Sequence, residues 1–260
     1  MDTEFKHIEY KQLKKHAEII LREEDRRNAL SMELMQELTG AIRLAGAEPS
    51  AQLLVISARG PVFCAGADLK YLSAHADPES YRNYAQEVFM MLKTISLSPV
   101  PVLTLVNGSA FGGGLGIIAA SDMVFSIDSA RFSFSEIKLG LVPAIISPWI
   151  FRKILVSKAG EMMLTGRGFD ASEAIDAGLV HHVFKGGEFL KQTSGVASSF
   201  YENAPGATRE IKQLLIEQED FANKLTEKEA YLVEKFTKTL SGEEARKGLK
   251  AFMDNTKIEW

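Results

Sequence analysis

The stretch NGSAFGGGLGIIAASDMVFSIDSARFSFSEIKLGLVP, residues 107–143, decides how this chain folds. It follows an apolar, β-branched segment that ends at Val106 and predicts a buried strand. Three consecutive glycines, at 112–114, then precede small apolar residues that predict a buried helix over 115–120. Glycines in a row are costly inside a regular element, so they indicate backbone that comes close to another group. Such a turn would present free backbone N–H groups to a ligand, although tight packing of helix on strand explains the glycines equally well.

A single carboxylate follows the glycines in the segment FSFSEIKLG, residues 132–140. Glu136 stands there among apolar and hydroxyl side chains. Such surroundings raise the pKa of a carboxyl group toward a value suited to proton transfer. A solvated glutamate without a catalytic role is the simpler interpretation of one isolated residue.

The composition excludes several classes of protein. The 260 residues are 46% hydrophobic and 25% charged, which is ordinary for a globular protein. A net charge of −4 gives no basic surface for nucleic acid or an anionic membrane. The one cysteine, Cys64, excludes an internal disulfide and a multi-thiolate metal site, and small-residue packing explains it better than a nucleophile does. With no apolar run of membrane-spanning length and no signal segment, we expect a cytoplasmic protein without a bound metal.

Strands and helices alternate along the first part of the chain. Apolar segments at 5–10 and 17–21 predict two neighbouring strands, and residues 53–57 predict another. Ser31 is a candidate N-cap for the helix that follows it, and Asp77, before a proline, predicts the start of a second helix. This alternation favours the α/β class, in which ligands bind outside the carboxyl ends of the strands.

The pattern changes after Pro148. Helical spacing predicts short helices at 149–156, 157–165 and 171–177, with a strand at 179–184. From residue 187 onward the chain is charged and helical in spacing, and no low-complexity linker precedes it. We therefore expect the C-terminal helices to pack on the core.

Two strand-to-helix connections carry small residues after the strand, at 65–67 and at 112–114. Backbone N–H groups from the two loops could converge on one oxygen and form an oxyanion hole, which stabilises a thioester enolate by several kcal/mol. The small residues Ala67 and Gly113 would let the carbonyl approach closely, and Glu136 could then move the proton. A competing interpretation is the dinucleotide fingerprint, which residues 114–119 also match, but a lone fingerprint is weak and these glycines come late in the chain.

Several segments in this order resemble the enoyl-CoA hydratase/isomerase (crotonase) family. They are FCAGADLKYL (63–72), NGSAFGGGLG (107–116), FSFSEIKLGLVP (132–143) and LTGRGFDASEAIDAGLVHHV (164–183). The resemblance implies an α/β fold that is a spiral of ββα units, with a C-terminal helical trimerisation region, rather than one doubly wound sheet. It implies a catalytic core over residues 1–200, a helical region for oligomerisation and active-site closure over 201–260, and a trimer or a pair of trimers.

The resemblance also implies roles for individual residues. The N–H groups of Ala67 and Gly113 would form the oxyanion hole for an acyl-CoA thioester, with Glu136 as acid and base, and the CoA would be part of the substrate, with no further cofactor. The remaining positions matched to substrate and CoA binding are Ala29, Ala65, Asp68, Leu69, Gly112 and Gly116. Arg26 or Arg27 could reach the CoA phosphates, and Phe252 and Lys257 lie where relatives contact CoA.

One departure from the family pattern bears on the reaction. Many hydratases carry two glutamates, and Gly116 stands at the position of the first, whereas isomerases of the family often keep only the later one. The segment LGLVPAIISPWIFRKI (139–154) nevertheless resembles methylglutaconyl-CoA hydratases. We therefore predict hydration of an enoyl-CoA thioester, of the branched or glutaconyl type, with Δ3,Δ2-enoyl-CoA isomerisation as the alternative. A non-catalytic CoA- or RNA-binding relative is the third interpretation.

Overall fold

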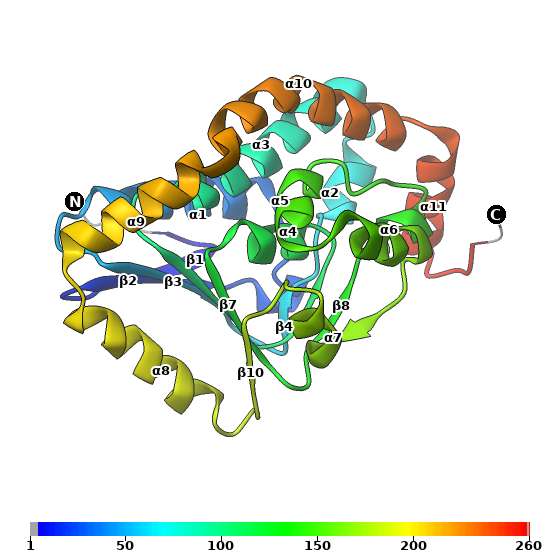
Figure 1. The fold of residues 1–260 in the computed structure, drawn as a ribbon. Helices are drawn as coiled ribbons and strands as arrows, with labels where there is room; N and C mark the ends of the chain where they lie inside the picture. Colours follow the sequence, from blue (N-terminus) through cyan, green and yellow to red (C-terminus); the bar gives the residue numbers. More distant parts are fainter. Residues whose placement is uncertain (1–4, 259) are drawn as a thin grey trace.

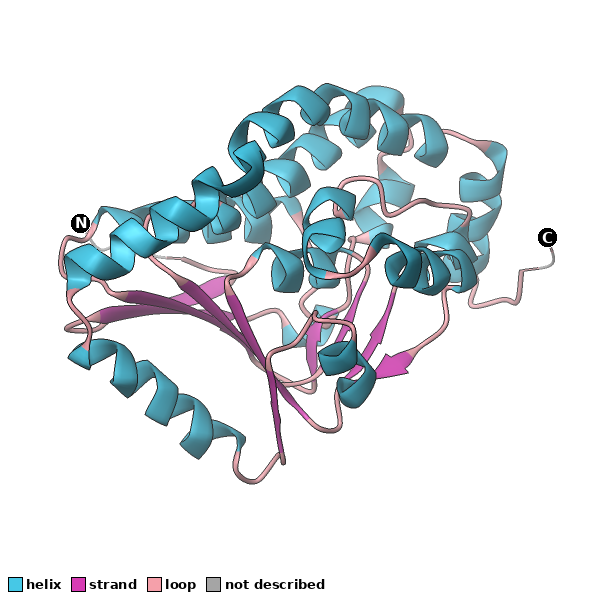
Figure 2. Ribbon diagram, viewed as in Figure 1, coloured by secondary structure: helices cyan, strands magenta, loops and turns pink. Residues whose placement is uncertain are grey.

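Two sheets form the centre of the molecule in the computed structural model, which describes residues 5–258 and 260. The larger has six strands in the order β1-β2-β3-β5-β7-β10. Its strands are β1 (Ile8–Gln12), β2 (His16–Leu21), β3 (Leu53–Ala58), β5 (Val102–Val106), β7 (Met123–Ile127) and β10 (His182–Phe184). The first two form an antiparallel hairpin and every other pairing is parallel. Helices cover both faces of this sheet (Figure 2), which explains the continuous apolar runs in its inner strands.

The smaller sheet has the order β4-β6-β8-β9 among the described residues. Its strands are β4 (Val62–Cys64), β6 (Ser109–Phe111), β8 (Arg131–Ser133) and β9 (Phe169–Asp170). Each of the first three directly follows a strand of the larger sheet, β3, β5 and β7 respectively, and leads into a helix or helical turn. This repetition confirms the spiral of ββα units and excludes a single doubly wound sheet.

Helices are present where the sequence predicts them, although those predicted to begin at residues 115 and 149 begin two residues earlier. In chain order they are α1 (Met32–Ala47), α2 (Leu69–Ala74), α3 (Pro78–Ser96), α4 (Gly113–Ala120), α5 (Ser147–Lys153), α6 (Val156–Thr165), α7 (Ala171–Asp176), α8 (Phe189–Ser199), α9 (Pro205–Glu217), α10 (Phe221–Leu240) and α11 (Glu243–Met253). The Ser31 hydroxyl accepts a hydrogen bond from Leu34 N at 3.2 Å, and Asp77 accepts one from Ser80 N at 2.9 Å. Both side chains satisfy free N–H groups of a first turn, so both predicted N-caps are confirmed.

The last two helices pack back onto the core (Figure 1). Helix α10 lies along α3, and α11 packs against the 3₁₀ helix η2 (Ser135–Leu139). The contact is between backbones, because a β-carbon added to Gly248 would lie 2.2 Å from Leu139 O. Helix α11, in the C-terminal region, thus lies against the 3₁₀ helix that carries Glu136. No helix in the described part of the chain is long and apolar enough to span a bilayer.

Candidate active site

The carboxyl ends of three neighbouring strands meet at one place. Strand β6 pairs in parallel with β4 on one side and with β8 on the other. The loops 65–67, 112–113 and 134–136, which follow these strands, therefore lie next to each other. Segments separated by about seventy positions in the sequence are brought to one site by this sheet.

Ala67 offers a backbone N–H group at the first of these loops. Its neighbour Gly66 has φ +88°, a conformation that favours glycine, and its carbonyl accepts a hydrogen bond from Leu30 N at 2.8 Å. A β-carbon on Gly66 would lie 2.8 Å from Phe111 O, so the loop also needs glycine to pass the end of β6. Among the described residues Ala67 N–H has no hydrogen-bond acceptor, and Ala67 is partly exposed.

Gly113 offers a second N–H group, at the start of helix α4. Gly112 before it has φ +49° and donates its N–H to Ser133 O at 3.1 Å. A β-carbon on Gly113 would lie 2.6 Å from Leu30 Cδ1, so the Leu30 side chain would have to move to admit one. Within the described residues Gly113 N–H has no acceptor, as expected for the first N–H of a helix. The glycine run thus serves both close packing and a free donor.

Glu136 stands in the first turn of η2, beside the glycines. Its Oε1 lies 3.1 Å from the position that a Gly112 β-carbon would occupy. Its Oε2 is buried and has no hydrogen-bond partner among the described residues. Burial raises the pKa of Glu136 to about 7, because desolvation disfavours the ionised carboxylate. A carboxyl group with this pKa is suited to both accepting and donating a proton near neutral pH.

Two connected hollows meet at these groups. The inner pocket has a volume of about 80 Å³ and the outer groove about 820 Å³. Gly112, Gly113 and Glu136 line the inner pocket, whose other walls are largely aliphatic. Five residues line both hollows and so mark the junction: Ala65, Ala67, Leu69, Ser135 and Leu139. An extended ligand could pass through this junction with one end in each hollow.

The outer groove contains further residues that the sequence indicates. Ala29, Asp68 and Phe252 line it, as do the basic side chains Arg26, Arg27, Lys70 and Lys138. The Asp68 carboxylate already has partners within the protein. It is ion-paired with Arg26, and it caps helix α2 by accepting a hydrogen bond from Tyr71 N at 3.1 Å. Lys257 lines an adjoining hollow together with Lys250. The charged residues that line the outer groove are four basic and two acidic, Asp25 and Asp68, so this lining carries a net positive charge.

Gly116 lies apart from both hollows. It is buried inside helix α4, where an added β-carbon would meet Ile146 Cγ2 at 2.7 Å and Leu92 Cδ1 at 3.0 Å. Gly114 is likewise buried, against the Cys64 backbone and side chain. These two glycines of the dinucleotide-like pattern are thus packing positions. Burial also raises the pKa of the Cys64 thiol to about 12, which agrees with a packing role for that residue.

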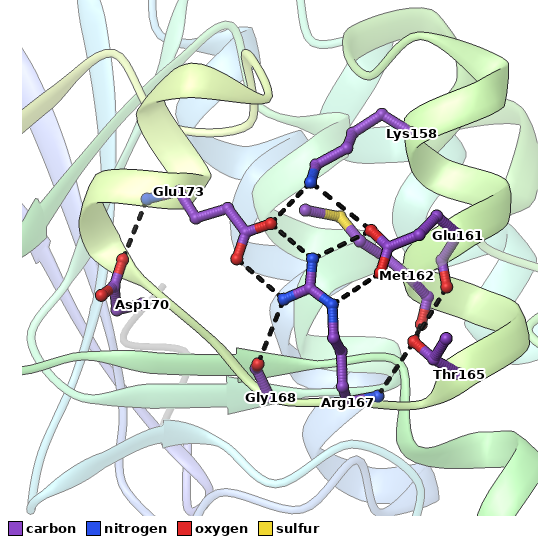
Figure 3. A network of polar contacts seen from close by, with 8 residues as sticks. All are labelled: Lys158, Glu161, Met162, Thr165, Arg167, Gly168, Asp170 and Glu173. Atoms are coloured by element: carbon purple, nitrogen blue, oxygen red, sulfur yellow. Dashed lines mark hydrogen bonds and ion pairs between the residues drawn. The ribbon is translucent and has the colours of Figure 1, made fainter.

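A surface network of ion pairs joins helices α6 and α7 through Arg167, in the loop between them (Figure 3). Arg167 lies between two carboxylates, with Nε 2.6 Å from Glu161 Oε1 and Nη1 2.8 Å from Glu173 Oε2. Gly166, next to it, has φ +56° and accepts a hydrogen bond from the Ser133 hydroxyl at 3.0 Å. Since Ser133 O in turn holds Gly112 N–H, this loop supports the turn at the glycines. No group of three or more metal-ligating side chains occurs in the described residues.

Comparisons with known proteins agree with this geometry. The family model for enoyl-CoA hydratase/isomerase matches residues 14–260. Enoyl-CoA isomerase/hydratase fer4 of Mycosarcoma maydis is 30% identical over 207 residues, which cover 76% of this chain and 75% of that protein. Enoyl-CoA hydratase domain-containing protein 3, mitochondrial, of Xenopus laevis is 29% identical over 246 residues, covering 93% and 82%.

A solved structure agrees with the family match. The crystal structure of an enoyl-CoA hydratase from Mycobacterium avium superposes with a TM-score of 0.87 at 25% identity, covering 100% of both chains. The chain therefore belongs to the enoyl-CoA hydratase/isomerase family, a family of enzymes, and has its crotonase fold.

Proposed function

We propose that this protein is an enoyl-CoA hydratase that adds water across the 2,3 double bond of an enoyl-CoA thioester. The observation that carries the proposal is one buried carboxyl group, Glu136, beside two backbone donors without acceptors, Ala67 N–H and Gly113 N–H. Donors held in place before the reaction stabilise an oxyanion more than they stabilise a ground-state carbonyl. This arrangement suits a reaction that passes through a thioester enolate.

The two hollows suit the two parts of such a substrate. The acyl group would occupy the inner pocket, with the thioester carbonyl at the junction beside Ala67. The CoA moiety would lie in the outer groove, where Arg26, Arg27 and Lys138 offer cations to its phosphates. In this scheme CoA is part of the substrate and no other cofactor takes part.

Glu136 would carry out both proton transfers. Its carboxylate accepts a proton from water as the water oxygen bonds to Cβ, and the electron pair of the double bond moves to the thioester oxygen. The N–H groups of Ala67 and Gly113 hold the resulting enolate. The protonated Glu136 then donates its proton to Cα, which gives the 3-hydroxyacyl-CoA. A pKa of about 7 suits both steps, because neither form is strongly disfavoured at neutral pH.

Isomerisation of a 3-enoyl-CoA to the 2-enoyl-CoA is the second candidate. It needs one group that removes a proton from Cα and returns it to Cγ, and Glu136 is the only carboxylate among the residues that line the inner pocket. Gly116 is packed against Ile146 and Leu92 outside the inner pocket and offers no second acid–base group. The relative from Mycosarcoma maydis is named for both reactions.

The acyl group that fits best is compact and uncharged. Lining residues from 141 to 146, together with Val88 and Phe236, make the inner pocket apolar, and no lysine, arginine or histidine lines it. A glutaconyl carboxylate would therefore lie without a cation and close to Glu136, which costs several kcal/mol. Crotonyl-CoA is thus a better first substrate than 3-methylglutaconyl-CoA, and a preference for the latter would show that the pocket opens further.

The absorbance of the enoyl thioester tests both reactions. Loss of absorbance with crotonyl-CoA is the expected result, whereas a gain with a 3-enoyl-CoA and no change with crotonyl-CoA would identify an isomerase. Glu136→Gln should lower kcat by about 10²- to 10⁴-fold with little change in ligand binding. Glu87→Gln, on α3 and outside both hollows, is the control. Full activity of Glu136→Gln would remove this residue from the mechanism.

We also propose a homo-oligomer, a trimer or a pair of trimers. Large apolar side chains are exposed on α6 and α9, among them Leu164 (75% exposed) and Leu214 (66%), and contacts between copies would cover them. Analytical ultracentrifugation should give a mass of three or six chains, and a monomer at micromolar concentration would contradict the proposal. A cytoplasmic location stays a prediction.

A further inference from the structure

Tyr84 lies buried behind the first oxyanion loop, and its hydroxyl makes two hydrogen bonds there. The residue comes from α3 and is 1% exposed. Its hydroxyl donates to Leu30 O at 2.7 Å and accepts from Asp68 N at 3.0 Å. Its ring stacks between Tyr71 and Phe236, with centroids 5.8 Å and 6.4 Å away, and this stacking fixes the position of the hydroxyl oxygen.

The direction of the Ala67 N–H is fixed on one side by Leu30. Gly66 O and Ala67 N–H belong to the same peptide group, which is planar and trans, so the two bonds point in opposite directions. Because Gly66 O accepts from Leu30 N at 2.8 Å, the Ala67 N–H points away from Leu30. Ala67 lines the inner pocket, and its N–H has no acceptor among the described residues, so it is free to donate to a ligand there.

The peptide group on the other side of Ala67 is fixed by Tyr84. This group contains Asp68 N–H, which donates to the Tyr84 hydroxyl. The same hydroxyl is bonded to Leu30 O, and the N–H of Leu30 is bonded to Gly66 O. A closed ring of hydrogen bonds therefore surrounds Ala67, and Tyr84 contributes the only side chain in it. With both flanking peptide groups held, the φ and ψ angles of Ala67 are fixed as well.

Other roles for this hydroxyl fit the geometry less well. Burial raises the pKa of Tyr84 above its ordinary value, and its hydrogen is already donated to Leu30 O, so it has no proton to offer a ligand. The side chain of Asp68 cannot replace it in the ring, because that carboxylate is bonded to Tyr71 N and Arg26.

We propose that Tyr84 is a positioning residue whose hydroxyl aims the Ala67 N–H at the thioester oxygen. The inference rests on the proposed function in one respect, the use of the Ala67 N–H as an oxyanion donor. Without the hydroxyl, Asp68 N–H and Leu30 O lose a buried partner, and the peptide group between Ala67 and Asp68 is held less firmly, through the parallel bridge of Leu30 with Ala67 and the Leu30 N–Gly66 O bond. A misdirected Ala67 N–H would then stabilise the transition state less, while the binding of the ground-state thioester would change little.

Tyr84→Phe tests this, because it removes one oxygen and keeps the stacked ring. Complete loss of an oxyanion donor costs about 10²–10³ in kcat, so a misdirected donor should cost about 10- to 100-fold. KM for crotonyl-CoA should change less than about twofold, since ground-state contacts are retained. The matched control is Tyr81→Phe, on the same helix: Tyr81 is 4% exposed and its hydroxyl makes no hydrogen bond within the described residues. This control should keep wild-type kcat.

A spectroscopic readout separates positioning from general loosening of the fold. The carbonyl stretch of bound crotonyl-CoA should be lowered in the wild type by the two donors and should move back toward its free value in Tyr84→Phe. An unchanged stretch together with wild-type kcat would overturn the inference, as would an equal loss in Tyr81→Phe.

If Tyr84→Phe does not fold, 3-fluorotyrosine at position 84 is the second variant. The fluorine makes the hydroxyl oxygen a weaker acceptor for Asp68 N–H and keeps the ring, so a smaller change in the same direction is expected. Unchanged rate and stretch there would also overturn it. Failure of the proposed function would be seen separately, as a wild-type protein that turns over no enoyl-CoA.

Discussion

Glu136 lies directly over Gly112: a β-carbon built on the glycine would be 3.1 Å from Oε1 of the carboxyl group. The two residues come from the ends of neighbouring strands, β6 and β8, and a hydrogen bond from Gly112 N to Ser133 O at 3.1 Å holds those ends together. The acid–base group and the turn that carries the Gly113 N–H are thus fixed by the same contact. A change at Gly112 must affect both.

Gly112→Ala should therefore lower activity more than its size suggests. The native φ of +49° costs a residue with a side chain about 1–3 kcal/mol, and the new methyl group would press on Glu136. We expect kcat to fall by at least about tenfold and the Tm to drop, measured by steady-state kinetics and calorimetry. Gly160→Ala is the control, because its β-carbon would meet nothing within 4 Å in helix α6, so it should stabilise the protein slightly. A fully active Gly112→Ala would mean that the carboxyl group is held elsewhere.

The pH dependence of hydration should report the ionisation of Glu136. Burial raises the pKa of its carboxyl group from 4.5 to about 7, so at pH 5 the group is almost wholly protonated and cannot accept a proton from water. The value of kcat/KM should rise as pH increases through about 7 and then level off, since the free enzyme must carry the carboxylate. Rates measured at saturating and at low crotonyl-CoA between pH 5 and pH 9 would show this. A profile that is flat across pH 7 would assign the proton transfer to another group.

Local patterns were sufficient to predict the groups that the structure brings together at the candidate site. The small residues at 65–67, the glycines at 112–113 and the isolated Glu136 each stand out in their own segment, and the sheet brings them together as expected. Their exact neighbours could not be predicted in the same way. Tyr84 and Leu30 look like ordinary apolar-face residues of their segments, and only the packing of α3 on the first loop gives the Tyr84 hydroxyl its two partners.

Periodicity alone does not predict the strands of the smaller sheet, for a related reason. Strands β4, β6 and β8 are three residues long, too short for alternating hydrophobicity to be recognised against the surrounding turns. The placement of Gly116 also depends on distant residues, because Ile146 and Leu92 approach it from separate segments. Contacts between segments decide such details, and periodicity within one segment carries no information about them.

Arg167 should stabilise the fold without entering the chemistry. It lies between Glu161 and Glu173, and mainly through its hydrogen bonds it lowers the pKa of Glu173 to about 2. Arg167→Leu should lower the Tm by a few degrees at pH 7 while kcat changes little. A carboxylate with a lowered pKa stabilises the protein above its unfolded pKa and loses that effect as pH falls through its folded pKa. The Tm difference from the wild type should therefore shrink as pH decreases from about 4.5 toward 2. Arg82→Leu, which breaks a single exposed pair with Glu234, should have a much smaller effect at every pH.

A second carboxylate cannot be added at position 116 unless the wall opposite is opened. In Gly116→Glu the new side chain would meet Ile146 Cγ2 and Leu92 Cδ1 in a buried place that offers a charge no partner, so we expect a fall in stability of several kcal/mol and weak or no hydration. Ile146→Ala alone should cost about 2–5 kcal/mol through the cavity it leaves. Because the two changes relieve each other, the double variant should be more stable than the sum of the single variants indicates, which a double-mutant cycle by urea denaturation measures. Hydration of crotonyl-CoA by the double variant at or above the wild-type rate would show that Ile146 controls access of a second acid–base group. Strict additivity of the two stability changes would show instead that Gly116 and Ile146 do not interact.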